Sequence, residues 1–276
     1  MVNIFNYIDR PSPIHRLTGA TKLILLLLWT FAAMITYDTR VLALFPLLAL
    51  ILFSMSKIKL KDVRFILAAT FIFMVLNNLL VYLFAPEHGV EIYGSRTVLL
   101  TLGGRYTVTA EQLFYHLNLI LKYLAQIPII LLFVSTTDPS EFAASLNKVG
   151  VNYKIAYSVA LALRYIPDIQ REYHDISLSQ QARGIEMSRK ESLVKRLKAA
   201  ASILIPLIMS SMDRIETISN AMELRGFGKG KTRSWYSEKP FKAGDWLTIA
   251  LGVLLLALVI FMFKADGGRY YNPFAG

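Results

Sequence analysis

Cysteine is absent from the 276-residue chain, and charged residues are scarce at 18%. Without thiols, the chain can hold no disulfide framework, zinc–thiolate site, iron–sulfur cluster or cysteine nucleophile. Soluble domains carry roughly 25% charged residues and about 45 to 50% apolar residues, whereas this chain is 55% apolar with a mean hydropathy of +0.46. The composition therefore predicts an integral membrane protein.

The few charges that remain are unbalanced. Thirty Lys and Arg residues against nineteen Asp and Glu residues give a net charge of +11. In membrane proteins such an excess usually gathers on the cytoplasmic side, where the lipid headgroups are anionic. We therefore expect the bilayer to be the main partner of the basic residues, and we expect no nucleic acid.

Five stretches are apolar enough to enter a bilayer, whose hydrocarbon core requires about 20 helical residues. Only the fourth contains a full charge, Lys122, and the first two are short: 23–37, 41–56, 65–84, 112–135 and 246–263. A cleaved signal peptide is an alternative for the first stretch, but a second apolar run follows it at once. We predict five membrane helices.

Basic residues in the connections predict the orientation, because Lys and Arg are retained on the cytoplasmic side. They precede the first stretch and fill the connection before the third: Arg10, Arg16, Lys22, Lys57, Lys59, Lys61 and Arg64. The connection 85–110 balances two bases against two acids and is glycine-rich, as expected of an outer loop or hairpin. This places the N-terminus inside and divides the chain into an N-terminal membrane part (1–135), a cytoplasmic part (136–242) and a C-terminal membrane helix with its tail (243–276).

The long basic segment 136–242 has helical periodicity. Asp138, Pro139 and Glu141 suit a helix N-terminus, where a side-chain cap, a proline and an acid are all favoured. The apolar stretches 153–166 and 199–212 are shorter than a comfortable span, and a proline follows the first and lies inside the second. They are expected either to enter the membrane partly or to pack on each other.

Two polar helices that follow these stretches resemble each other. Four residues recur at an offset of 42, namely Ile176, Ser177, Arg183 and Gly184 as Ile218, Ser219, Arg225 and Gly226. Both copies end in an apolar residue, Arg and Gly: Ala182, Arg183, Gly184 and Leu224, Arg225, Gly226. Glycine can adopt the left-handed geometry that stops a helix, and arginine suits the negative helix end. Each pair alone is thus an ordinary helix cap.

The charge around these two helix ends suggests more than capping. Between residues 183 and 233, eleven basic residues face five acidic ones, a net charge of +6. Two similar helices with Arg at corresponding ends suit docking on a two-fold acidic partner. Contact with lipid headgroups is the alternative, and for most of the lysines we prefer it.

The order of these features resembles the transmembrane T component of energy-coupling factor (ECF) transporters, which take up vitamins and trace metals. The matching residues are Ser12, Pro13, His15, Arg16, Leu17 and Lys22, then 136–139, 162–167, the first Ala–Arg–Gly motif, and 224–228. Leu224 departs from the Ala that is commoner at the first motif position. The resemblance covers nearly the whole chain.

This resemblance implies an all-α integral membrane protein with about five transmembrane helices and long cytoplasmic coupling helices, which acts as a scaffold in the cell membrane. Each motif Arg would dock into a groove on one of two ATP-binding cassette (ABC) ATPase subunits, and another face would hold a small membrane S component that binds the substrate. Closure of the ATPases would pull the coupling helices together and tilt the S component. The chain itself would be no enzyme and would need no cofactor.

Catalytic and metal-binding patterns are weak. Gly230, Lys231 and Thr232 match the tail of a phosphate-binding loop, but its first glycine would fall at Arg225. Four histidines, His15, His88, His116 and His174, show no ligand spacing, so no metal is expected. Three acids on one helical face, Asp168, Glu172 and Asp175, have Arg164 and Arg171 nearby and are interpreted as intrahelical ion pairs.

A polar stripe remains inside the fourth apolar stretch. Asn118, Lys122 and Gln126 follow at four-residue steps and share one helical face. In a self-contained secondary transporter or channel, the alternative function, these residues would form the substrate or proton site. We prefer a hydrogen-bond cluster with Asn77 and Asn78. A third alternative, a membrane-embedded enzyme acting on lipid, lacks convergent acids or histidines.

Overall fold

The computed structural model describes residues 7–103, 106–185, 192–230 and 234–274. It divides into two compact units, and each is described by itself. The bundle unit comprises Met1–Glu141 and Lys239–Gly276, and the two-helix unit comprises Phe142–Glu238. The boundary near residue 141 falls inside helix α8 (Pro139–Lys148).

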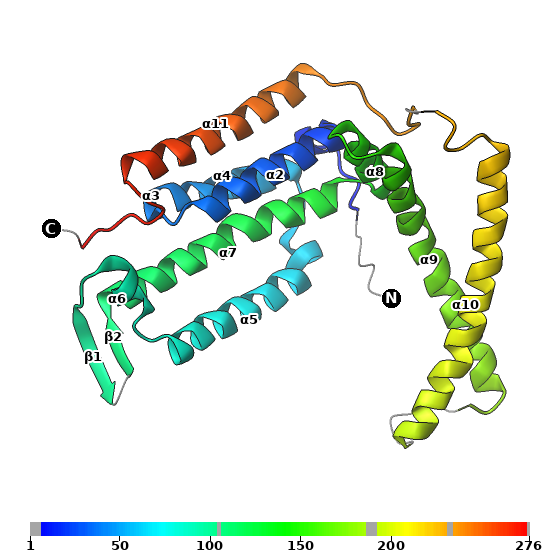
Figure 1. Ribbon diagram of the computed structural model, residues 1–276, viewed down its shortest axis with the longest axis horizontal. Coiled ribbons are helices and arrows are strands. Elements are labelled where there is room, and N and C mark those ends of the chain that lie inside the picture. The colour runs from blue at the N-terminus through cyan, green and yellow to red at the C-terminus, as the bar shows by residue number, and fades with distance from the viewer. Residues whose placement is uncertain (1–6, 104–105, 186–191, 231–233, 275–276) are drawn as a thin grey trace. The chain divides into compact units, whose positions relative to one another are not determined.

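The bundle unit is built from helices and one small hairpin (Figure 1). In chain order its elements are α1 (Pro13–Arg16), α2 (Gly19–Ile35), α3 (Thr39–Leu42), α4 (Leu44–Ser56), α5 (Leu60–Phe84), α6 (His88–Tyr93), β1 (Val98–Gly103), β2 (Tyr106–Thr109), α7 (Ala110–Thr136) and α11 (Ala243–Ala265). Helix α11 lies along α2, while α7 packs against α2 and α4 and carries α5 on its other side. The connection 85–110, for which a loop or hairpin is predicted, contains α6 and the antiparallel pair β1–β2.

Within the described residues, four helices are long and apolar enough to cross a membrane: 39–56, α5, α7 and α11. The fifth apolar helix, α2, has 17 residues and falls short, in agreement with the short first stretch of the sequence. Helix α5 exposes large apolar side chains on several sides, such as Phe65 at 74% and Ile72 at 67%. Such exposure is stable in lipid and costly in water. The chain is therefore an all-α integral membrane protein.

The core of the bundle unit lies where α2, α4, α7 and α11 meet. Trp29 of α2 packs edge-to-face on Phe45 with ring centroids 5.0 Å apart, and its Nε1 donates to the Ala125 carbonyl at 2.9 Å. Gly252 of α11 approaches α2 so closely that a Cβ atom there would lie 3.1 Å from Leu28. Small residues at such crossings allow membrane helices to approach each other.

Polar groups tie together the helix ends at one end of the bundle unit. The Lys22 Nζ donates to the Thr136 carbonyl at the end of α7 at 2.7 Å. The Glu141 carboxylate accepts from the Gly19 amide, and Asp245 accepts from the Thr18 amide, each at the N-terminus of α2. Carboxylates at helix N-termini and a cation at a C-terminus satisfy backbone groups that the helices leave unpaired.

The two-helix unit is dominated by two long antiparallel helices, α9 (Tyr153–Ala182) and α10 (Leu193–Leu224). Each helix joins one of the predicted apolar stretches to the polar helix that follows it, so the expectation of separate helices was wrong. Pro167 and Pro206 lie inside α9 and α10 respectively, without ending them. Neither helix is among the candidate membrane spans of the described residues, and the two pack on each other.

Candidate functional site

The Arg183 end of α9 is a complete glycine-terminated helix cap. Arg183 is the C-cap residue, and Gly184 takes a left-handed conformation with φ +81°. The Gly184 amide donates to the Gln181 carbonyl at 2.9 Å, and the Ile185 amide donates to the Gln180 carbonyl at 3.1 Å. This pair of bonds defines the Schellman motif and satisfies two carbonyls that the helix leaves open.

The Arg225 end of α10 has the same geometry, 42 residues later. Gly226 has φ +66°, and its amide donates to the Glu223 carbonyl at 2.8 Å. The Phe227 amide donates to the Met222 carbonyl at 2.9 Å. The sequence repeat therefore corresponds to a structural repeat, in which both Schellman hydrogen bonds occur at equivalent positions of the two copies.

Both motif arginines are exposed, and so are the residues before them. The Leu224 side chain is 90% exposed, and Ala182 and Gly184 are also exposed. Within the described part of the chain, neither Arg183 nor Arg225 forms a side-chain hydrogen bond or an ion pair. A guanidinium group presents five donors in a planar fork. These two forks are therefore available to a partner.

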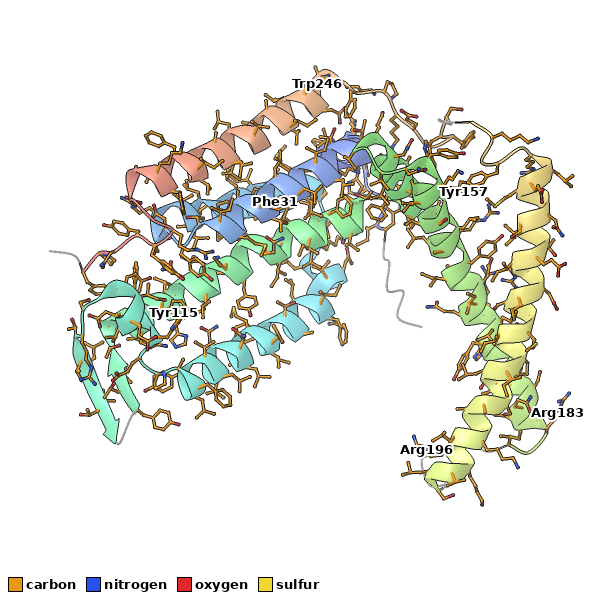
Figure 2. The ribbon with its side chains drawn as sticks, viewed as in Figure 1. Phe31, Tyr115, Tyr157, Arg183, Arg196 and Trp246 are labelled. Atoms are coloured by element: carbon orange, nitrogen blue, oxygen red, sulfur yellow. The ribbon has the colours of Figure 1, made fainter. Side chains whose placement is uncertain are left out.

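Contacts between α9 and α10 place the two motifs at opposite ends of the helix pair. At the Arg183 end, the Gln180 Nε2 donates to the Ser202 carbonyl at 3.2 Å. At the Arg225 end, the ring of Tyr157 lies 4.8 Å from that of Phe227. Figure 2 shows Arg183 at the same end of the pair as Arg196, with Tyr157 toward the other end.

Most of the basic surface expected between residues 183 and 233 is described, and part of it is not. Lys195, Arg196 and Lys198 lie at the start of α10 and are exposed. Arg189, Lys190, Lys231 and Arg233 lie outside the described residues, as does Lys231–Thr232 of the phosphate-loop match. That match follows the cap of α10, and the described residues before it form no strand.

The three acids of α9 are only partly paired as predicted. Asp168 forms the expected intrahelical pair with Arg171 at 3.0 Å. Glu172 instead pairs with Arg214 of α10 at 2.9 Å, and it also accepts a hydrogen bond from Ser210. The intrahelical interpretation was therefore wrong for Glu172. Glu172 and Arg214 occupy equivalent positions of the 42-residue repeat, but such equivalence does not by itself predict that the two residues are in contact.

The polar stripe of α7 binds neighbouring elements, but not those expected. Asn118 is buried and accepts from the Thr39 hydroxyl at 2.7 Å, and the Gln126 Nε2 donates to the Thr30 hydroxyl at 2.6 Å. The Lys122 Nζ lies 3.3 Å from the centre of the Tyr37 ring. Asn78, one of the two predicted partners, instead donates from Nδ2 to the Met74 carbonyl at 2.9 Å, and its Oδ1 is hydrogen-bonded to His116 Nδ1 at 2.9 Å.

His15 fixes the N-terminal motif rather than a ligand. Its Nε2 donates to the Ile8 carbonyl at 2.8 Å, so in the neutral ring Nδ1 accepts from the Ser12 hydroxyl at 2.7 Å. Burial lowers the pKa of His15 below its ordinary value of 6.5. In the part of the chain that the structure describes, His, Asp and Glu residues form no group of three that could hold a metal ion.

Comparison with known proteins gives a consistent result. Residues 10–235 match the family model CbiQ, described as a cobalt transport protein. The chain is 30% identical over 269 residues to the energy-coupling factor transporter transmembrane protein EcfT of Bacillus selenitireducens, covering 93% of this chain and 95% of that protein. It is 26% identical to EcfT of Bacillus subtilis (94% and 97% covered) and 28% identical to EcfT of Streptococcus thermophilus (95% and 98% covered).

These relatives extend over nearly the full length of the chain and share its membrane character. They are named transmembrane proteins of the energy-coupling factor transporter, which agrees with a multi-pass protein of the cell membrane. The chain belongs to the CbiQ family and is a transmembrane T component of an energy-coupling factor transporter.

Proposed function

We propose that this T component couples two ABC-type ATPase subunits to a small membrane S component, and that Arg183 and Arg225 are the ATPase-docking residues. The observation that carries the proposal is the pair of matching helix caps. Each presents an exposed Arg at one end of the α9–α10 pair. Two equivalent ends suit two equivalent partners, as in a dimer of ATPase subunits.

The chemistry of the Arg183 and Arg225 side chains favours binding in a specific groove of each ATPase subunit over a general attraction between opposite charges. A guanidinium group binds carboxylates or helix-end carbonyls through two parallel hydrogen bonds, which an ammonium group reproduces poorly. Ala182 and Leu224 are exposed beside the arginines and supply apolar contact. ATP hydrolysis then belongs to the partner chains, and this chain transmits their motion without catalysing a reaction.

An exposed apolar stripe on α10 supports contact with the S component. Its members recur every three or four residues and are 47 to 62% exposed: Leu204, Ile208, Met212 and Ile215. A single apolar face of this length is costly in water, and a second apolar helix would cover it. Closure of the ATPases would move α10 and thereby tilt an S component bound along this stripe, releasing a vitamin or trace metal inward.

Exposed basic residues at the end of α4 and the start of α5 support a cytoplasmic location for this connection. Lys57 and Lys59 lie in this connection, Lys61 lies in the first turn of α5, and all three are exposed. Lys and Arg in short connections are retained in the cytoplasm, where the ATPases would also lie. The N-terminus and the two-helix unit are accordingly proposed to be cytoplasmic.

Reversing the charge of both Arg183 and Arg225 tests the proposal. We expect Arg183→Glu with Arg225→Glu to abolish copurification of the ATPase subunits in mild detergent at physiological salt, with each single reversal weakening it. The bundle unit should be unaffected, because both side chains are exposed and form no hydrogen bond or ion pair with the residues that the structure describes. Thermal stability of the purified chain reports on that fold.

Arg196→Glu is the matched control. Arg196 is exposed near the Arg183 end of the helix pair, but it is not a helix cap. If the basic surface as a whole bound the ATPases, this reversal would weaken the complex as much as Arg183→Glu does. Retention of the ATPases by the Arg183→Glu, Arg225→Glu double variant would refute the docking role.

A further inference from the structure

The ion pair between Glu172 and Arg214 joins equivalent positions of the internal repeat. The two residues are 42 positions apart, which is the offset that relates Arg183 to Arg225. Consequently Arg183 follows Glu172 by eleven residues, and Arg225 follows Arg214 by eleven residues. At about 1.5 Å per residue, each arginine tip lies roughly 16 Å along its helix from the ion pair.

The ion pair is also the main polar link between α9 and α10. Both Glu172 oxygens are engaged by α10, one by the Arg214 guanidinium at 2.9 Å and the other by the Ser210 hydroxyl. The Arg214 guanidinium also lies 5.7 Å from the centre of the Tyr165 ring of α9. The Glu172 side chain is only 20% exposed. The Arg214 side chain is 34% exposed, so the pair is partly open to solvent, and removing one partner mainly removes this contact between the helices.

The surroundings of the pair leave room for a change of helix angle. A cavity of about 680 Å³ opens beside it and is lined by side chains from both helices, including Asp168, Asp175 and Thr217. Dense apolar packing would resist rotation, because close-packed interfaces have few alternative arrangements. Toward the Arg183 end the packing is tighter, with Ile203 and Ala199 of α10 buried.

From this geometry we infer that the Glu172–Arg214 pair is the pivot of the α9–α10 pair, about which the two arginine-tipped arms change their angle. The inference rests on the proposed coupling function. Equal arms on both sides of a fixed polar contact convert closure of a two-fold ATPase pair into a symmetrical rotation. Without the contact, the helices would slide past each other and lose part of the motion. Glu172 and Arg214 are thus positioning residues.

The test measures the change in the angle between α9 and α10 through the distance between two spin labels. Spin labels are placed at the equivalent exposed positions 179 and 221, through Ser179→Cys and Ala221→Cys. The chain has no cysteine of its own, so these are its only labelled sites. Distances are measured in the complex purified with its ATPase subunits, without nucleotide and with a non-hydrolysable ATP analogue.

We expect the analogue to shift the label distance in the unaltered complex. Glu172→Ala, Glu172→Gln and Arg214→Ala should each change the equilibrium ratio of the two distance populations about fivefold or more, while the ATPases still copurify. The charge swap Glu172→Arg with Arg214→Glu should restore most of the shift, because it restores the ion pair. If the single variants acted by disturbing helix packing in general, the swap would not restore the shift. Arg171→Ala, which removes a charge from the same cavity without breaking an interhelical bond, should leave the shift intact.

Each other outcome has a definite meaning. A full nucleotide-dependent shift in the single variants, or a swap that is worse than either single variant, would overturn the pivot. So would a loss of shift in Arg171→Ala as large as that in Glu172→Gln. If the unaltered chain purifies without ATPases, the proposed function fails, and the pivot fails with it. If the ATPases bind normally and only the pivot variants behave unexpectedly, the docking proposal stands.

Discussion

At the scale of single residues, Lys122 is a charge inside a membrane helix whose contacts are with the end of α2 and the residues that follow it. Its Nζ donates to the Met34 carbonyl at 3.2 Å and lies over the Tyr37 ring. A cavity of about 520 Å³ beside it is lined mainly by apolar side chains such as Phe73 and Leu119. Cation–π contact and a carbonyl bond stabilise the ammonium group where water is scarce. These contacts suit a role in packing α7 against α2.

His15 gives a prediction on pH dependence. Burial lowers its pKa, so the folded chain binds a proton less readily than the unfolded chain. The stability that this neutral ring contributes is complete above pH 6.5 and is lost as the pH falls below that value. We expect the unfolding temperature of the detergent-purified chain to drop between pH 7 and pH 5, and His15→Gln to make this drop shallower.

Thermal unfolding at a series of pH values checks this expectation. The comparison of slopes matters more than the absolute values, because other groups also titrate in this range. An equal slope in the unaltered chain and in His15→Gln would show that His15 does not contribute.

At the scale of elements, the two helix caps explain why the motif requires glycine after arginine. Gly184 and Gly226 have φ values of +81° and +66°, which most side chains avoid. Among the described residues, leaving aside the two neighbours of Gly184 in the chain, none has a heavy atom within 4 Å of a Cβ placed there. Backbone conformation, rather than crowding, therefore restricts this position.

Substitutions at Gly184 should follow left-handed propensity rather than side-chain size. Asn adopts this conformation more readily than other residues, whereas a β-branched residue is strained there. We expect Gly184→Asn to retain ATPase copurification and Gly184→Val to destabilise the cap by about 1 to 2 kcal/mol and weaken binding. Copurification in mild detergent, with increasing amounts of the ATPase subunits added, measures how strongly each variant binds them. Equal loss in both variants would mean that the site needs glycine for close approach of a partner.

The same elements show what the sequence could and could not predict. Caps and spans depend on local residues, so the start of α8 at Pro139 and the glycine caps were predictable. The continuity of α9 through Pro167 was not, because packing against α10 compensates for a lost helical bond. The partners of Glu172 and Asn118 lie 42 and 79 residues away, and helical periodicity carries no information on such contacts.

At the scale of the whole molecule, the chain divides into a bundle unit that contains the candidate membrane spans and a two-helix unit that carries the proposed docking residues. The bundle unit is held by buried packing around Trp29 and by its tied helix ends. The two-helix unit carries both motif arginines and the Glu172–Arg214 pair. We therefore expect substitutions in the bundle unit to affect stability in the membrane, and substitutions in the two-helix unit to affect partner binding.

The central claim is that both arginine-capped helix ends contact the ATPases. Site-specific photocrosslinking tests it most directly, with the photoreactive residue placed at Ala182 or at Leu224 in the assembled complex. A third position, Val194, serves as control because it is 78% exposed on α10 and lies outside both motifs. We predict crosslinks to ATPase subunits from positions 182 and 224 and a much weaker product from 194. Crosslinks from the motif positions to lipid alone, or to no other chain, would contradict the account.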